Sequence, residues 1–212
     1  RAKVDLAGYA DLRRLHALLS GPLPSTAEPE LVTSERLELG LLERNYAAAR
    51  QALAAHALPN FNWAGYVTPR EWYEGLIAQG SGDRAAAQAA FEAAHRLVAS
   101  IVAERPDDAK AHIVQAEIEA RLGRKADAIR SGERALSLRP VAKDAVDGVH
   151  ITGRLAGVYA QVGEIPRGLE LLASAASMPN GPNYGSLKLD ETWDPLRQEA
   201  WFAAIVATLA PR

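Results

Sequence analysis

The feature that most constrains this chain is a pair of predicted helices between Asp107 and Pro140. The first begins at Asp107 and Asp108, because carboxylates near a helix N-terminus complement its unpaired N–H groups and its dipole. It ends at Gly123. The second covers residues 125–138, since the residue before Pro140 is pushed out of the helical region. The stretch is therefore predicted to form a helical hairpin.

Small residues recur on one side of both predicted helices. They are Ala116, Ala128, Gly132 and Ala135. Side chains of this size let two helix backbones approach closely, which is the packing logic of a helical repeat.

With Ala109 as its first position, the stretch resembles the tetratricopeptide repeat, a helix–turn–helix unit of 34 residues. The matching residues, at places 8, 15, 20, 27 and 32, are Ala116, Gly123, Ala128, Ala135 and Pro140. Places 4, 7, 11 and 24, where the family has larger and mostly apolar residues, hold His112, Gln115, Glu119 and Gly132. The resemblance implies a scaffold of stacked helices that binds other proteins.

Two further copies of the pattern flank this one. The copy that begins at Thr68 carries Gly75, Gly82, Ala87, Phe91 and Ala94 at matching places. The copy that begins near Val149 carries Leu155, Ala156, Tyr159, Gly163, Gly168, Leu172 and Ala175. The steps between copies exceed the usual repeat length, so we expect longer helices. One extends through Arg105, and the first helix of the last copy extends backward to about Val141.

The remaining segments have less regular patterns. We expect one helix with leucines on one side that ends near Ser20, as a lone second helix of a repeat, and then a hairpin over residues 30–43 and 46–57. Residues 58–66 have no helical period and contain three aromatic residues, which we expect to fill a gap between neighbouring hairpins.

The C-terminal part begins with a Pro- and Gly-rich stretch that cannot continue a helix. We expect an extended segment over residues 186–193, and then a final helix that opens at Asp194 and Pro195, ends near Leu209 and covers the end of the stack. Residues 184–197 also resemble the C-termini of bacterial signalling proteins in which a tetratricopeptide region follows a Ser/Thr kinase, adenylate cyclase or winged-helix domain.

The predicted fold is therefore all-α. It is a tetratricopeptide-like superhelix, or solenoid, of about four helical hairpins, with an incomplete N-terminal repeat and a C-terminal capping helix. Residues 1–180 form the repeat array, and residues 181–212 form the extended tail and capping helix of the same domain. Because the chain starts at Arg1 without methionine, we expect it to be a fragment of a longer protein. Only 6% of its residues are aromatic, and alanine is abundant, which favours closely packed helices over sheet.

Composition argues against several functions. The chain has no cysteine, which excludes thiol chemistry, cysteine-based metal sites and disulfides. A net charge of −2 without a concentrated basic face argues against nucleic-acid binding. No apolar stretch approaches the ~20 residues that cross a bilayer, so we expect a soluble segment without direct membrane insertion. The bacterial cytoplasm and the extracytoplasmic side both remain open.

No pattern predicts catalysis. The five histidines are scattered, and no two stand four residues apart, the spacing that would place two rings on one metal. Residues 80–83 resemble a phosphate loop but follow a helix rather than a strand. No Gly-x-Ser-x-Gly turn is present. We therefore expect no catalytic residue, metal or cofactor, and a chain that is not an enzyme.

The resemblance implies a binding groove on the concave face, lined by the first helices of the repeats. The candidate groove residues are Trp72, Tyr73, Leu76, Lys110, Ile113, Val114, Glu117, Arg121, Arg154 and Gln161. Two aromatic residues beside an aliphatic patch, with three basic residues at the rim, suit an extended peptide with apolar anchors and an acidic end. In the competing interpretation, residues 61–66 simply cover Trp72 and Tyr73.

The expected function is a non-catalytic scaffold for a protein or peptide partner, associated with a signalling domain on its N-terminal side. A second hypothesis is self-association into a homo-oligomer through exposed aromatic residues such as Trp63, Trp193 or Trp201. A third is a small-ligand sensor or enzyme, which requires a closed pocket with several buried ionisable groups.

Overall fold

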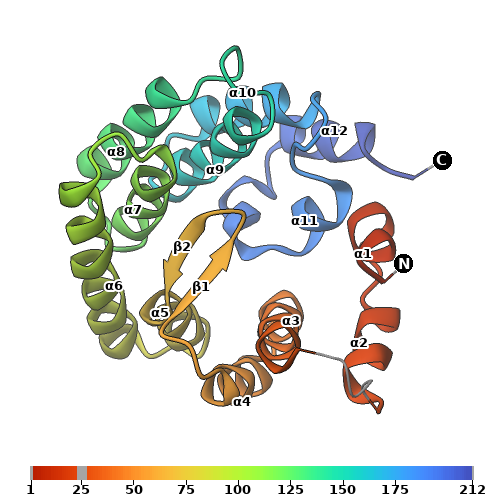
Figure 1. The fold of residues 1–212 in the computed structure, drawn as a ribbon. Coiled ribbons are helices and arrows are strands. Elements are labelled where there is room, and N and C mark those ends of the chain that lie inside the picture. The colour runs from red at the N-terminus through yellow and green to blue at the C-terminus, as the bar shows by residue number, and fades with distance from the viewer. Residues whose placement is uncertain (1, 23–27, 212) are drawn as a thin grey trace.

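The computed structural model describes residues 2–22 and 28–211, and in these ranges helices dominate (Figure 1). The predicted all-α class is confirmed, with one short β-hairpin added. The α-helices are α1 (Ala2–Tyr9), α2 (Arg13–Ser20), α3 (Pro29–Leu42), α4 (Tyr46–Ala55), α5 (Arg70–Gly80), α6 (Arg84–Glu104), α7 (Ala109–Arg121), α8 (Lys125–Leu138), α9 (Asp147–Gln161), α10 (Ile165–Ala176), α11 (Tyr184–Leu189) and α12 (Ala200–Thr208). The other elements are strands β1 (Asn60–Trp63) and β2 (Tyr66–Pro69) and the 3₁₀ helix η1 (Glu191–Leu196).

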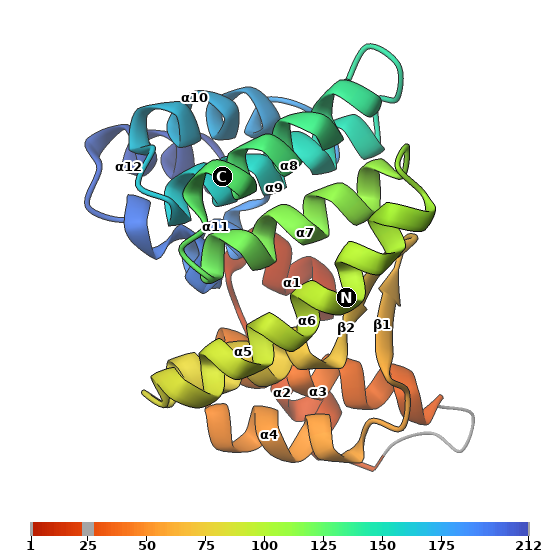
Figure 2. The same cartoon turned by 90° about the vertical axis from the view of Figure 1, so that its left-hand side faces the viewer.

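Consecutive helices pack in pairs: α3 with α4, α5 with α6, α7 with α8, and α9 with α10. Neighbouring pairs also touch, since α7 contacts both α6 and α9. The pairs follow a curved path, and α1 at one end packs against α11 at the other, so the helices surround the β-hairpin as a closed ring (Figure 1). Figure 2 shows the outer side of this ring, formed there by α6, α7 and α8.

Short capped turns set the helix boundaries. Gly82, Gly123 and Gly163 have φ values of 82°, 71° and 81°, and each lies in the turn between the two helices of a pair. Glycine adopts this left-handed conformation without steric cost. The side chains of Asp83 and Asp108 accept hydrogen bonds from backbone N–H groups at the start of α6 and α7. The predicted helix over residues 125–138 is confirmed, as is the long helix that ends near Arg105.

Small residues let helices approach closely as predicted, both within a pair and between neighbouring pairs. A Cβ atom on Gly75 of α5 would lie 2.4 Å from the ring of Phe91 on α6, and one on Gly132 of α8 would lie 2.4 Å from Leu155 on α9. The largest core cluster runs without a break from Tyr66 through α5–α9. A second cluster joins α9 and α10 to the C-terminal helices, and two smaller ones lie around α3 and α4 and around α1 and α2.

Three predictions for the chain ends are wrong. The single helix expected to end near Ser20 is divided into α1 and α2, because Ala10 has a φ of 53°, which no helix interior accommodates. The extended segment expected over 186–193 is helical instead. Asn183 and Ser186 form a reciprocal cap that opens α11, and Asp190 caps η1. Pro195 therefore lies inside η1, and the final helix begins at Ala200.

The predicted extension of a helix back to Val141 is also wrong, since α9 begins at Asp147. The side chain of Asp144 accepts hydrogen bonds from the N–H groups of Val146 and Asp147, at 3.0 and 2.9 Å. Gly148 lies so close to the backbone of Val141 that a Cβ there would be 2.6 Å from its nitrogen. The extra residues thus form a capped loop that folds back on the start of α9.

Residues 60–69 form a β-hairpin, a structure not predicted for the aperiodic segment over 58–66. β1 and β2 are antiparallel, with Trp63 opposite Tyr66. Ala64 and Gly65 form the two-residue turn with φ values of 51° and 85°. Positive φ at both positions is the geometry of a type I′ turn, whose twist matches that of the flanking strands.

Candidate functional site

The predicted groove residues lie on α5, α7 and α9, and the chain's own β-hairpin packs against this side of the ring (Figure 1). Strand β2 contacts α5, α6 and α7. Lys110 Nζ donates a hydrogen bond to the carbonyl oxygen of Ala64, at 2.6 Å. The ring of Tyr73 lies 4.4 Å from that of Phe61. Trp72 instead packs against Phe91, at 5.5 Å between ring centroids.

Phe61 occupies an aromatic slot between two helices. One wall is the ring of His56, stacked at 4.0 Å with an interplanar angle of 11°, and the other is Tyr73. Nδ1 of His56 lies 2.8 Å from a carboxylate oxygen of Glu30 and 3.0 Å from the hydroxyl of Thr33. These contacts orient the imidazole. We call the space between His56 and Tyr73 the Phe61 slot.

Tyr66 occupies a second slot, formed by two cations. The guanidinium carbon of Arg154 lies 4.5 Å from the centroid of the Tyr66 ring, and Lys110 Nζ lies 5.1 Å from it. Cations at such distances are attracted to the face of an aromatic ring. Arg154 also donates two hydrogen bonds to Glu117, the Nε bond at 2.7 Å, and Lys110 Nζ lies 3.0 Å from Asp147. Both cations of the Tyr66 slot are thus already paired with acids.

A second segment of the chain, η1, covers the other end of the predicted groove. Arg121 lies 3.2 Å from Glu191, and Gln161 donates a hydrogen bond to the carbonyl oxygen of Thr192 at 2.9 Å. Burial raises the pKa of Glu191, and the positive charge of Arg121 opposes that rise. Arg44 on the opposite side of the ring lies 2.8 Å from Asp194. Two predicted groove residues therefore bind the chain's own C-terminal part.

Three predicted groove residues belong to the core rather than to a surface. Leu76, Ile113 and Val114 are buried within the largest cluster. Their exposed fractions are 8%, 0% and 1%, so none is accessible on the surface of the folded chain. In the folded chain these three side chains pack within the core, and their contact with a partner stays a prediction.

The two slots raise the pKa values of their tyrosines. Burial raises the pKa of both Tyr66 and Tyr73 to about 12 from an ordinary value of 10.0, although the charge of Arg154 opposes the rise. Between about pH 10 and pH 12 the unfolded chain binds fewer protons than the folded chain. Stability is therefore full below about pH 10 and falls as the pH rises toward 12.

Burial also raises the pKa of Tyr159. Besides that group, we expect a pH titration monitored by phenolate absorbance to show two tyrosines that ionise near pH 12, and Tyr66→Phe to remove one of these two. Because the Tyr66 hydroxyl is buried without a hydrogen-bond partner, Tyr66→Phe should raise the free energy of unfolding near neutral pH by about 1 kcal/mol. Tyr9→Phe, at an exposed tyrosine, should leave both late transitions in place. Early ionisation of all tyrosines in the folded chain would contradict the assignment.

Sequence reasoning missed Phe61, Tyr66 and His56 as contributors to this site. The signal that could have found the hairpin is the Ala64–Gly65 pair between short runs rich in aromatic residues, because glycine in a two-residue loop favours a hairpin turn. His56 carried no such signal. Its role depends on Phe61 and Glu30, which only the fold brings beside it.

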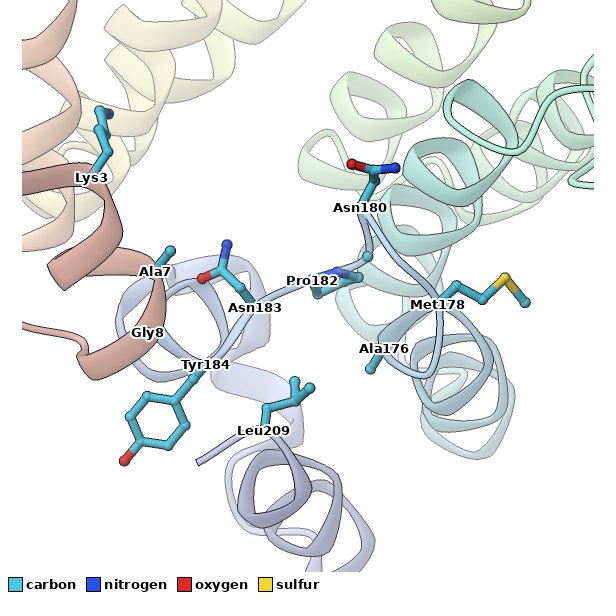
Figure 3. A pocket seen from close by; sticks show the side chains of 11 residues that line it. Lys3, Ala7, Gly8, Ala176, Met178, Asn180, Pro182, Asn183, Tyr184 and Leu209 are labelled. Carbon is cyan, nitrogen blue, oxygen red and sulfur yellow. The ribbon is translucent and has the colours of Figure 1, made fainter. Parts of the chain in front are cut away.

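A separate open groove lies between α1 and the loop that follows α10 (Figure 3). Its volume is about 550 Å³, and its lining is mainly apolar. It is lined by Lys3, Ala7, Gly8, Ala176, Met178, Asn180, Gly181, Pro182, Asn183, Tyr184 and Leu209. Lys3 Nζ is engaged by Glu35 and Glu38, both at 2.6 Å. The groove therefore offers no free charge from Lys3 to a ligand.

Among the described residues, no three His, Asp or Glu side chains gather in a way that could hold a metal ion. None of the described helices has both the length and the apolar composition that crossing a membrane requires. Comparisons of the chain with protein-family models, with curated proteins and with solved structures found no match.

Proposed function

We propose that this chain is a non-catalytic protein-interaction module, a tetratricopeptide-like superhelix at the C-terminus of a larger bacterial signalling protein, and that it binds a peptide or protein on its concave face. The observation that carries the proposal is the β-hairpin on that face. Its side chains fill two slots, and Lys110 binds one of its backbone carbonyl groups. These are contacts that a bound peptide would make.

The arrangement of the helices supports the same proposal. The two helices of a pair are joined by glycine turns, and the helices pack through small residues, as in stacked repeats. Gln161 donates to a backbone carbonyl group of η1, as Lys110 does to one of the hairpin. Side-chain donors that point from first helices toward the backbone of an enclosed segment are suited to peptide recognition without dependence on a particular peptide sequence.

Selection from a displayed library of random peptides tests the proposal. The library would be panned against the natural chain and against a Phe61→Ala/Tyr66→Ala variant, which removes both hairpin anchors. We expect enriched peptides whose affinity falls at least about tenfold with Lys110→Ala, which removes the donor to the hairpin's carbonyl group, and is unchanged with Arg130→Ala, a substitution on the exposed side of α8. Failure to enrich any peptide on either form, or peptides indifferent to Lys110, would refute concave-face binding.

Self-association is a second candidate function, favoured by the outer face of α12. This helix contains no charged residue, and Trp201 on its outer face is 47% exposed. The other exposed residues of the helix are Ala200, Ala203, Ala204, Ala207 and Thr208. An uncharged exposed face of this kind is typical of a contact surface. By contrast, Trp193 is buried and can no longer serve the predicted self-association.

If α12 mediates self-association, the mean mass in sedimentation equilibrium should rise with protein concentration. Trp201→Glu should then raise the dissociation constant at least about tenfold, because it places a charge in an apolar contact. Leu97→Glu, at an exposed leucine of α6, is the matched control and should leave the dissociation constant unchanged. A mass independent of concentration would eliminate this candidate.

A further inference from the structure

The hairpin fits the concave face incompletely. Three of its contact side chains keep buried polar atoms without hydrogen-bond partners: Oη of Tyr66, Nε2 of His56 and Nδ1 of His150. His56 stacks on Phe61, and the ring of His150 lies 5.4 Å from that of Trp63. A buried polar atom without a partner loses its bonds to water and gains none in return. This interface is therefore less stable than its apolar contacts alone would make it.

The two strands are also attached unequally. β2 packs against α5, α6 and α7, whereas β1 packs chiefly on β2. In β1 only Phe61 is buried, and Trp63 is 63% exposed. A two-stranded hairpin is marginally stable on its own. Its position therefore depends on the Phe61 slot and the Tyr66 slot, so a segment that fills these slots better can replace it.

The slots define the chemistry of such a segment. The Phe61 slot binds an aromatic ring, and Lys110 donates a hydrogen bond to a backbone carbonyl oxygen. His56 and His150 each offer an imidazole nitrogen to a hydrogen-bonding side chain. Because Glu117 and Asp147 already pair with the cations of the Tyr66 slot, the site does not require an acidic ligand.

We propose that the β-hairpin is an internal occupant of the concave face, displaced by a partner segment with aromatic anchors flanked by hydrogen-bonding side chains. This inference rests on the proposed interaction function and adds the kind of partner and its competition with the hairpin. The binding surface is thus closed in the free chain, and the partner binds as the hairpin leaves.

A peptide with the sequence of residues 58–70, carrying a fluorophore, is the probe. Binding would be measured by fluorescence anisotropy to the full natural chain, to Phe61→Ala/Tyr66→Ala and to Asn60→Ala, a control at an exposed hairpin position. The anchor variant should bind the peptide at least about tenfold more tightly than the other two. Adding Tyr73→Ala should remove this gain, and a scrambled peptide should not bind. Equal binding to all three chains would overturn the inference, as would no binding to an anchor variant that retains its helical content.

Hydrogen exchange on the natural chain provides a second measurement, independent of whether the anchor variant folds. A displaceable hairpin opens as its own unit, so the protection of the amides in β1 and β2 should be at least about tenfold lower than that of α7 amides. Equal protection would overturn the inference. Library peptides that depend on Lys110 but bind the natural chain and the anchor variant equally would preserve the proposed function and refute displacement.

Discussion

Replacing Phe91 with alanine should lower the free energy of unfolding by about 3–5 kcal/mol, the usual cost of removing a fully buried aromatic ring. Phe91 is 1% exposed and lies on α6 against Gly75 of α5 and the indole of Trp72. A glycine facing the ring has no side chain that could move into the space left behind. The cavity should therefore stay open, and the loss should fall at the upper part of this range.

The measurement is urea denaturation followed by circular dichroism. Leu97→Ala is the matched control, because Leu97 lies on the same helix and is 44% exposed. Its cost should stay below about 1 kcal/mol, since exposed positions contribute little to stability. Equal losses for the two variants would show that the packing of α5 on α6 does not limit the stability of the chain.

Gly185→Ala should detach α1 from α11 and open the ring. A Cβ atom at this position would lie 1.8 Å from the backbone carbonyl oxygen of Leu6, a contact that no side-chain rearrangement can relieve. Helix α1 must therefore move away. The amides of α1 should lose protection from hydrogen exchange by at least about tenfold, while amides of α7 and α8 should keep theirs.

Gly8→Ala is the control for this variant. Gly8 lies on α1, and a Cβ there would meet nothing within 4 Å. Alanine is a better helix former than glycine by about 1 kcal/mol, so this substitution should raise the protection of α1. Unchanged exchange in Gly185→Ala, or a loss of protection throughout the chain, would show that the contact between α1 and α11 does not open independently of the other helices.

The paired helices between residues 70 and 176 were predictable because their signals are local. Asp108 caps a helix within three residues of itself, and Gly123 and Gly163 supply the left-handed turn conformation wherever they stand. At the C-terminus the local signals conflicted. Pro195 suits the first turn of a helix, but Asn183 and Asp190 begin two shorter helices before it. Propensity alone could not decide which cap would dominate.

The candidate site was predictable only in part. Repeat spacing correctly indicated that Lys110, Arg121 and Arg154 lie on first helices, and each makes contacts across the ring's inner side. Their partners could not be inferred, since the pairing of Arg121 with Glu191 spans seventy positions and depends on how far the array curves. Local periodicity carries no information about curvature summed over several helix pairs.

The contact between α1 and α11 has a mechanical consequence. A force applied between α1 and α11 themselves acts first on this contact, because the helix pairs from α3 to α10 lie along the rest of the ring between them. In a single-molecule extension experiment the contact between α1 and α11 would separate as one early event, and the ring of helix pairs would extend only afterwards. Gly185→Ala would abolish that early event and leave the later extension of the ring unchanged.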